Sequence, residues 1–364
     1  MQGPGYRHPR KPTTEKARMA SLAEKVRFLS DPAAYSGTEG VVRAHETHMS
    51  WVFIGERSVY KLKKPVRYPF LDFGTPAKRK FFCEEELRLN RRLAAETYRA
   101  VIPLCQGSAG SLSIGGEGKA VDWLVVMERL PEAEMLDEKI RHGRFGEDDV
   151  ARIGETLARF YRARRPEPDD GRLYLEHLRR EHVLNRTILS RRDLGLDEAA
   201  AALEAVGSAL ELLSPTIEDR IRRGLIVEGH GDLRPEHVCL VEPVQIIDCL
   251  EFNRAMRLID PYDEVGYLGL ECDVLGAAWV RPMLLDILEK RHGGRPGPQL
   301  LAFHGAFRAL LRARLCMAHL LETPVRHPLK WKPLALRYIA AAQRDCLNLP
   351  SREGPTAARP SPGA

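Results

Sequence analysis

The sequence of 364 residues lacks several features that would define its class at once. Its seven cysteines include no C-x-x-C pair, which argues against a disulfide frame or a zinc site and favours reduced thiols. No run of about 18 apolar residues occurs, so we expect no membrane span. Residues 1–16 are polar and basic without an apolar stretch, so we expect no secretory signal. These absences favour a cytoplasmic protein.

The sequence also lacks a strong excess of charge of one sign. Its 56 Lys and Arg residues stand against 50 Asp and Glu residues, which gives a net charge of +6. A mild, scattered excess fits an anionic ligand such as a nucleotide. Arginine richness alone keeps nucleic-acid binding as an alternative. Because no RNA-binding pattern of aromatic and basic residues occurs, we predict no nucleic-acid partner.

Hydrophobic periodicity and turn-forming residues predict four segments, which are 1–17, 18–130, 131–348 and 349–364. The two terminal segments are rich in Pro and Gly and are predicted to be disordered. The second segment favours strands at 50–54, 58–63, 100–106, 111–114 and 121–127. It also favours a short helix over 21–29 and a long one over 75–93, which starts at the Thr75-Pro76 pair.

The third segment is mainly helical in pattern. The predicted helices include 147–162, 173–189, 196–213 and 217–223, and two short strands are expected near 238–240 and 245–248. The sequence therefore predicts an α+β fold with two lobes, a small lobe of strands with one long helix and a large helical lobe.

The segment 226–240 is the most informative part of the sequence. An apolar approach leads to His230-Gly231-Asp232, and a second apolar strand delivers Asp248, 16 positions after Asp232. Two carboxylates are thus expected at the ends of a small β-ribbon. Phosphoryl transfer needs such a pair, because one carboxylate orients the acceptor hydroxyl while the other holds Mg²⁺ against the phosphates.

These motifs resemble those of a known family. His230 to Pro235 resemble the catalytic-loop signature of aminoglycoside phosphotransferases and of the related choline and fructosamine kinases. The segment 246–251 resembles their metal-binding strand end, and 260–265 resembles the Asp-Pro-x-x-Asp-Leu segment that follows. The resemblance covers roughly residues 40–345. It implies a protein-kinase-like fold, with a small antiparallel sheet lobe and a large helical lobe.

The resemblance also implies roles for individual residues. Asp232 would be the catalytic aspartate, with Arg234 beside it in the catalytic loop, and Asp248 would be the principal Mg²⁺ ligand. Lys61 would contact the phosphates of ATP, with Glu86 as its ion-pair partner. The implied activity is ATP-dependent transfer of a phosphoryl group to a hydroxyl group of a small molecule.

Five further residues are expected to bind the nucleotide. Thr47 and His48 lie where a phosphate-covering loop is expected, although a plain surface turn remains the alternative. Met127, Glu128 and Leu130 would belong to the hinge that holds adenine. Lys63 and Lys64 compete with Lys61 for the phosphate role.

One position departs from the family pattern. His237 stands where the family has an asparagine that helps to bind a second Mg²⁺, and imidazole suits this hard ion less well than an oxygen ligand does. His237 could orient a phosphate instead, Asn253 could supply the amide oxygen, or the second metal could be absent. This departure motivates an alternative function, a nucleotide-binding pseudokinase with a regulatory role.

Overall fold

The computed structural model describes residues 18–35, 37, 39–164, 170–321, 325 and 327–350. The disorder predicted for 1–17 and for most of 349–364 lies outside these residues. The chain divides into two compact units, which we call the strand-rich unit (residues 1–84 and 99–129) and the helical unit (residues 85–98 and 130–364). The sequence analysis assigns residues 85–98 to the first lobe, whereas the structure groups them with the helical unit.

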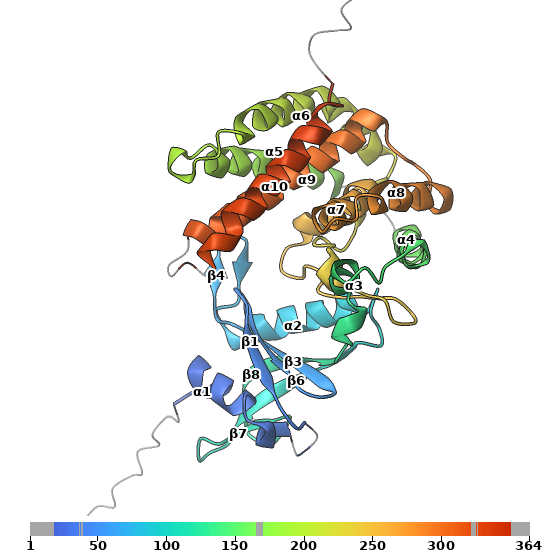
Figure 1. The fold of residues 1–364 in the computed structure, drawn as a ribbon. Coiled ribbons are helices and arrows are strands. Elements are labelled where there is room, and N and C mark those ends of the chain that lie inside the picture. Colours follow the sequence, from blue (N-terminus) through green and yellow to red (C-terminus); the bar gives the residue numbers. More distant parts are fainter. Residues whose placement is uncertain are drawn as a thin grey trace, which may run out of the picture. The chain divides into compact units, whose positions relative to one another are not determined.

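A six-stranded sheet with the strand order β1-β2-β3-β8-β6-β7 forms the strand-rich unit (Figure 1). Its strands are β1 (Arg43–Glu46), β2 (Ser50–Ile54), β3 (Ser58–Lys63), β6 (Tyr98–Gln106), β7 (Leu112–Ile114) and β8 (Lys119–Glu128). A separate small hairpin joins β4 (Arg67–Tyr68) to β5 (Leu71–Asp72). The pairs β1–β2, β2–β3, β3–β8 and β6–β7 are antiparallel.

The five strands predicted for this unit are all present, but β1 corrects the sequence analysis. The first strand predicted from the sequence begins at Ser50. Arg43 to Glu46 instead form a strand with one neighbour, and only Thr47 to Met49 form the turn that follows. Three of the four residues in β1 are exposed. An edge strand of this kind lacks the apolar alternation that marks a half-buried strand.

A buried ion-pair cluster ties two helices of the strand-rich unit to its sheet. Helix α1 (Leu22–Leu29) begins at Ser21, which forms a capping box with Glu24. Lys25 of α1 lies 2.7 Å from the carboxylate of Asp122 on β8. Arg79 of α2 (Pro76–Asn90) binds both oxygens of the same carboxylate, at 2.7 and 2.8 Å. The three side chains are buried, so each charge depends on the others for compensation.

The substitution Asp122→Ala should therefore lower the free energy of unfolding by about 3–5 kcal/mol, because it leaves two buried cations unpaired. The matched control is Glu155→Ala, which breaks an exposed pair with Arg291 and should cost less than about 1 kcal/mol. Urea unfolding of the two variants makes the comparison. Equal losses in both would show that the buried cluster is not a special contributor to stability.

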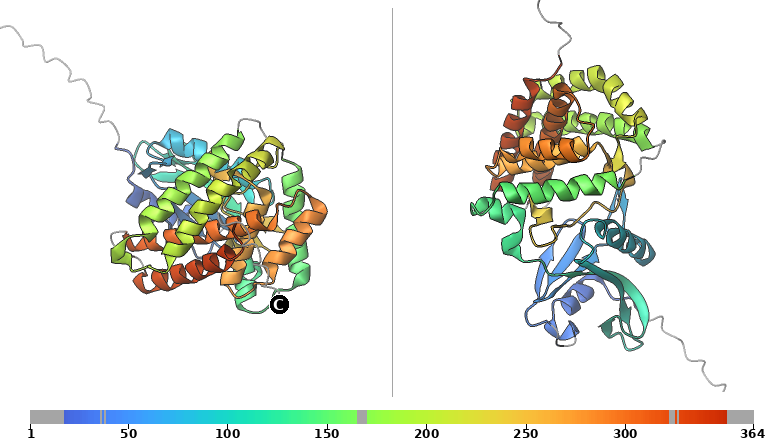
Figure 2. Two further views of the ribbon diagram at one scale, coloured as in Figure 1. Left: turned by 90° about the horizontal axis from the view of Figure 1, so that it is seen from above. Right: turned by 90° about the vertical axis from the view of Figure 1, so that its right-hand side faces the viewer.

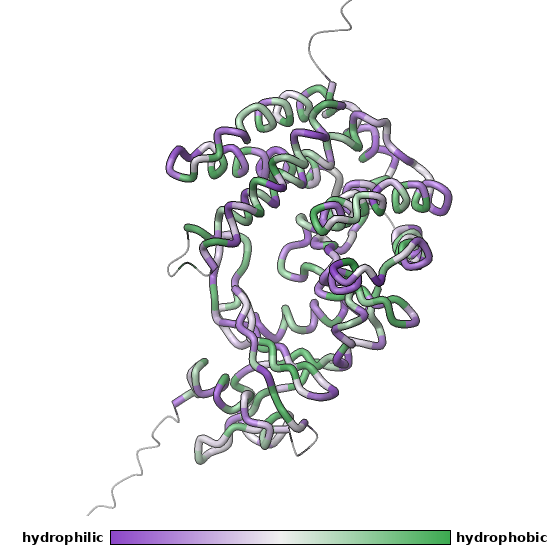
Figure 3. Tube along the Cα trace, in the orientation of Figure 1, coloured by the Kyte–Doolittle hydropathy of each residue, from purple (hydrophilic) through white to green (hydrophobic). Residues whose placement is uncertain are grey.

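Helices dominate the second unit. They are α3 (Leu136–Arg141), α4 (Glu147–Arg162), α5 (Asp170–Leu189), α6 (Ala199–Arg222), α7 (Pro261–Val274), α8 (Val280–Arg291), α9 (Pro298–Ala318) and α10 (Pro328–Cys346). Helices α5, α6, α9 and α10 pack side by side (Figures 1 and 2). Green and purple alternate along these helices in Figure 3, as expected for helices with one buried face and one exposed face.

Helix α6 corrects a second expectation, because the helices predicted over 196–213 and 217–223 are one continuous helix. Pro215 lies inside it, and the buried side chains of Leu213 and Ile217 on its two sides belong to one apolar cluster. Within the described residues, α6 is also the one helix that is long and apolar enough to cross a membrane. Its contacts with α5, α9 and α10 are those of a core helix.

Two short strand pairs complete the helical unit. Strands β9 (Val227–Glu228) and β12 (Leu258–Ile259) pair antiparallel, as do β10 (Val238–Cys239) and β11 (Gln245–Ile246). The second pair is the β-ribbon expected from the sequence. The predicted α+β class is confirmed, because a small antiparallel sheet unit is followed by a mainly helical unit.

Candidate active site

The backbone of the loop between β9 and β10 is fixed by one buried carboxylate. Glu264 of α7 accepts hydrogen bonds from the backbone N–H groups of His230, at 2.9 and 3.0 Å, and Gly231, at 2.6 Å. The hydroxyl of Tyr161 donates a third hydrogen bond at 2.7 Å. Burial raises the pKa of Glu264, while these donors stabilise its ionised form and oppose that rise. Glu264 belongs to the segment 260–265 that resembles the Asp-Pro-x-x-Asp-Leu motif, so this motif supports the loop.

Two glycines let the backbone approach this carboxylate. A Cβ atom at Gly229 would lie 2.5 Å from Oε2 of Glu264 and 2.6 Å from a methyl carbon of Ile259. Gly231 has a φ of +90°, a conformation that side chains disfavour. The close approach to Glu264 at Gly229 and the positive φ at Gly231 therefore explain why glycine stands on both sides of His230.

His230 connects this loop to the strand that ends at Asp248. Its Nε2 lies 2.8 Å from the carbonyl oxygen of Ile247, and its Nδ1 accepts the N–H of Asp232 at 3.3 Å. Burial lowers the pKa of His230 to about 4, with a further contribution from His237. The ring is therefore neutral at pH 7 and holds the backbone, which is a structural role.

The side chain of Asp232, in the loop between β9 and β10, is 34% exposed. Arg234 lies 3.0 Å from one carboxylate oxygen, and the hydroxyl of Tyr267 lies 3.4 Å from the other. Burial favours the neutral carboxyl, but the cationic charge of Arg234 outweighs it, and the pKa of Asp232 lies below its ordinary value. Asp232 is therefore ionised at neutral pH.

Asp248 is presented on a constrained backbone. Its φ of 59° is unusual for a residue with a side chain, and such conformations cost about 1–3 kcal/mol and persist only where neighbours enforce them. The hydroxyl of Tyr98 accepts its N–H at 3.1 Å, and Asn90 accepts the N–H of Cys249 at 2.8 Å. These contacts hold the strand end, while the side chain of Asp248 stays 45% exposed.

His237 lies between the two aspartates. Its Nδ1 lies 2.8 Å from the carbonyl oxygen of Asp232, so Nδ1 carries the proton and donates it. Its Nε2 then accepts from Arg234 at 3.2 Å, and it also lies 3.5 Å from a carboxylate oxygen of Asp248. The structure thus brings together Asp232, Arg234, His237 and Asp248 of the predicted site.

The oxygen ligands present fit a Mg²⁺ ion that is held only partly by protein. Mg²⁺ is often bound through one or two carboxylates together with water and substrate phosphates. The partly exposed carboxylate of Asp248 suits that pattern. Asn253 already accepts the N–H of Ala255 at 3.0 Å, so its predicted metal role would need a second lone pair. Among the described residues, no group of three His, Cys, Asp or Glu side chains could form an all-protein cage.

The predicted phosphate residues of the strand-rich unit lie on β3 and in the turn after β1. Lys61 on β3 pairs across the sheet with Val52 and Val125. The hydroxyl of Thr47 donates to the carbonyl of Ser50 and accepts its N–H, both at 3.0 Å, so it closes the turn. His48 is exposed in the same turn. The phosphate-binding role of these three residues stays a prediction.

The two competitors of Lys61 both have contacts within the strand-rich unit. Nζ of Lys63 lies 4.9 Å from the centre of the Phe73 ring. Nζ of Lys64 lies 2.7 Å from the carboxylate of Glu46. The choice among these three lysines for the phosphate role stays a prediction.

The burial of the three successive glutamates of α2 likewise favours one of them. Glu86 is fully buried, whereas Glu84 is exposed and Glu85 pairs with Arg88 at 2.7 Å. A buried glutamate needs partners far more than an exposed one does. Glu86 is therefore the best candidate for the predicted ion pair, which stays a prediction.

The predicted hinge residues lie where the strand-rich unit ends. Met127 and Glu128 close β8 opposite Val59 and Ser58 of β3. The side chain of Glu128 lies 2.5 Å from Arg99. Leu130 is the first residue of the second segment of the helical unit. Adenine binding at these residues stays a prediction.

Three supporting residues escaped the sequence analysis, namely Asn90, Tyr98 and Tyr267. Asn90 lies in a highly charged helix. Tyr98 is the first residue of β6, whose sequence pattern indicates only a strand of the sheet. Tyr267 lies in a helix buried on nearly all sides, so periodicity does not single it out. Only the folded chain shows that these side chains reach Cys249, Asp248 and Asp232 respectively.

No protein-family model matches this chain. Uncharacterised proteins of Mycobacterium bovis and Mycobacterium tuberculosis are 31% identical to it over 293 residues, which cover 76% of this chain and 55% of theirs. The chain therefore spans about half the length of these curated relatives.

Some solved structures are also similar. A choline/ethanolamine kinase family protein from Mesorhizobium loti is 16% identical, with a TM-score of 0.46 over 88% of this chain and 99% of that one. A choline kinase from Cryptosporidium parvum is 9% identical, with a TM-score of 0.47 over 84% and 88%. An aminoglycoside phosphotransferase from Alicyclobacillus acidocaldarius is 14% identical, with a TM-score of 0.43 over 92% and 96%. At this distance they identify neither family nor function.

Acidification should destabilise the protein through His230. Its pKa is about 4 in the folded protein and about 6.5 in the unfolded chain, so below pH 6.5 the unfolded chain binds a proton that the folded protein does not. The stability contributed by the neutral ring is thus present above pH 6.5 and is lost as the pH falls toward 4. At pH 5 the loss should be about 2 kcal/mol.

Urea unfolding at pH 7 and pH 5 tests this with the variant His230→Gln, which keeps polar atoms but cannot titrate. The difference in unfolding free energy between the two pH values should shrink by about 2 kcal/mol relative to the wild type. His142→Gln, at an exposed position, serves as the control and should leave the difference unchanged. If His230→Gln retained the full pH dependence, the assigned protonation of His230 would be wrong.

Proposed function

We propose that the chain is an ATP- and Mg²⁺-dependent phosphotransferase that acts on a hydroxyl group of a small molecule. The observation that carries the proposal is the pair of carboxylates beside His237. The ring nitrogens of His237 lie 4.0 Å from an oxygen of Asp232 and 3.5 Å from an oxygen of Asp248. Two carboxylates, one to orient the hydroxyl and one to hold the metal, are what phosphoryl transfer requires.

Asp232 would orient the acceptor hydroxyl and receive its proton as the new bond to phosphorus forms. Its lowered pKa keeps the carboxylate ionised, so it can accept a hydrogen bond from the hydroxyl at neutral pH. A carboxylate with a low pKa is a weak base, so most of its contribution would be orientation. Tyr267, which contacts the same carboxylate, would help to fix its direction.

Asp248 would hold Mg²⁺, which when bound neutralises the charge of the nucleotide phosphates. Arg234, which lies beside Asp232, would stabilise negative charge on the transferred phosphoryl group. It stays charged at any relevant pH and is held by Glu236 at 2.6 Å and by Asp232. His237 would keep the carbonyl of Asp232 in place through its Nδ1–H.

The strand-rich unit would bind the rest of the nucleotide. Lys61, paired with Glu86, would contact the phosphates, and Thr47 and His48 would cover them. The backbone of Met127, Glu128 and Leu130 would hold adenine. These assignments rest on the motif resemblance and, for Glu86, on its burial.

A pseudokinase is the second candidate, and His237 is the observation that favours it. Its Nε2 already accepts from Arg234, and the amide oxygen of Asn253 caps the following helical turn. A second metal would then have to share the amide oxygen of Asn253 with the N–H of Ala255 or lack an amide ligand. Nucleotide binding without phosphoryl transfer to any acceptor would support this reading.

We expect Asp232→Asn to lower turnover by about 10²–10⁴-fold while leaving nucleotide affinity unchanged, because it removes the group that receives the proton but no phosphate contact. Turnover is measured as release of ADP with an accepted alcohol. Asp197→Asn, the same chemical change at an exposed position, is the control. Equal losses of turnover and nucleotide affinity in Asp232→Asn would argue against the role of Asp232.

Asp248→Ala should abolish the Mg²⁺ dependence of nucleotide binding. In the wild type, ATP with Mg²⁺ at about 100 times its dissociation constant should stabilise the fold by roughly 2.7 kcal/mol, which thermal unfolding detects readily. The variant should respond equally with and without Mg²⁺. If Mg²⁺ still enhanced ATP binding in Asp248→Ala, this aspartate would not be the metal ligand.

A further inference from the structure

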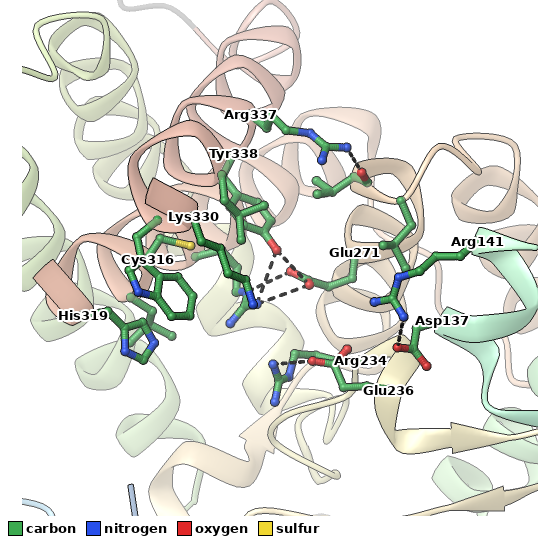
Figure 4. A pocket seen from close by; sticks show the side chains of 16 residues that line it. Asp137, Arg141, Arg234, Glu236, Glu271, Cys316, His319, Lys330, Arg337 and Tyr338 are labelled. Atoms are coloured by element: carbon green, nitrogen blue, oxygen red, sulfur yellow. Dashed lines mark hydrogen bonds and ion pairs between the residues drawn. The ribbon is translucent and has the colours of Figure 1, made fainter. Parts of the chain in front are cut away.

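A cavity of about 400 Å³ lies within the helical unit. Arg234 lines it (Figure 4) and places its guanidinium 3.0 Å from the carboxylate of Asp232. Its other walls come from α3, α7, α9 and α10. The volume suits a small metabolite. A molecule in the cavity could therefore extend a hydroxyl group toward Asp232.

The acidic side chains of this cavity already have cationic partners. The ion pairs are Asp137 with Arg141 at 2.7 Å, Glu236 with Arg234 at 2.6 Å and Glu271 with Arg312 at 2.8 Å. Glu271 also accepts a hydrogen bond from the hydroxyl of Tyr338 at 2.9 Å. A cationic substrate would have to compete with an arginine for each of these carboxylates.

Two cationic side chains of the lining have no such partner. Lys330 and Arg337, both on α10, form no ion pair with any residue of the described part of the chain, although Arg337 donates to the carbonyl of Val274. The lining therefore carries five Lys and Arg residues against three Asp and Glu residues, a net charge of +2. An anionic group would satisfy this excess.

The aromatic rings of the cavity already contact cations of the protein itself. Nζ of Lys330 lies 4.8 Å from the centre of the Trp331 ring, which also stacks on His319 at 3.9 Å. The guanidinium of Arg312 lies 5.3 Å from the Tyr338 ring. A quaternary ammonium group binds best to open aromatic faces. This cavity is therefore a poor site for such a cation.

We propose that this cavity binds the phosphoryl acceptor and that the acceptor is an anionic alcohol. Its hydroxyl would face Asp232, and its phosphate or carboxylate group would bind Lys330 and Arg337. The identity of the acceptor as a substrate rests on the proposed phosphotransferase function. In that reaction the acceptor oxygen bonds to the γ-phosphorus of ATP, the bond from that phosphorus to the bridging oxygen of ADP breaks, and the hydroxyl proton passes to Asp232.

Calorimetric titration without nucleotide tests the anion site directly. Inorganic phosphate, glycerol 3-phosphate and glycerate should bind the wild type, whereas glycerol and choline should bind at least about tenfold more weakly. Binding of the anions should weaken as salt is added. The phosphate and carboxylate probes separate the two sources of negative charge. Tighter binding of choline than of all three anions would overturn the proposal.

Substitution at the two unpaired cations locates the anion. The double variant Lys330→Glu/Arg337→Glu should bind inorganic phosphate about tenfold or more weakly, because it replaces two cationic hydrogen-bond donors by carboxylates that repel the anion. Lys290→Glu on α8 makes a matched charge reversal outside the cavity and should leave phosphate affinity nearly unchanged. Unaltered phosphate binding in the double variant would overturn the assigned site.

ATP binding, measured separately by thermal unfolding, distinguishes the two proposals. If ATP with Mg²⁺ stabilises the protein but cationic alcohols are phosphorylated in preference to anionic ones, the phosphotransferase function stands and the anionic acceptor is refuted. If anions bind at Lys330 and Arg337 but ATP does not bind, the phosphotransferase function fails and the anion site alone survives.

Discussion

The carboxylate of Glu264 is the group on which the candidate site depends. A buried carboxylate is costly unless hydrogen-bond donors surround it, and this one receives the N–H groups of His230 and Gly231 together with the hydroxyl of Tyr161. Glu264 on α7 therefore fixes the backbone of the loop between β9 and β10. The ring of His230 in turn contacts the carbonyl of Ile247, which directly precedes Asp248. The hydrogen bonds of one carboxylate thus help to fix the backbone near both aspartates.

The surroundings of the two aspartates differ in charge, and this difference suits them to different proposed roles. Asp232 lies among cations, chiefly Arg234, which keep it ionised and create a positive surrounding for phosphate groups. Asp248 is held by neutral hydrogen bonds to its backbone and keeps a partly exposed side chain, as a metal ligand shared with water and phosphate requires. The excess of positive charge continues into the cavity beside Arg234. Both substrates of the proposed reaction would then be anions.

Local patterns in the sequence predicted the elements well where one face is regularly apolar. Helix α4 spans the predicted residues 147–162, and the ribbon of β10 and β11 lies between the two aspartates as expected. The polar edge strand β1 and the passage of α6 through Pro215 were missed, because tertiary contacts decide both. The contacts that fix the site join residues 34, 150 and 159 positions apart, and no local pattern encodes such pairs.

A crystal structure with a non-hydrolysable ATP analogue and Mn²⁺ in place of Mg²⁺ tests the central claim most directly. Anomalous scattering would locate the metal without reference to the protein. The account predicts Mn²⁺ at about 2.0–2.2 Å from a carboxylate oxygen of Asp248, with the terminal phosphate directed toward Asp232 and Arg234. A nucleotide whose metal is bound without Asp248, or whose terminal phosphate points away from Asp232, would contradict it.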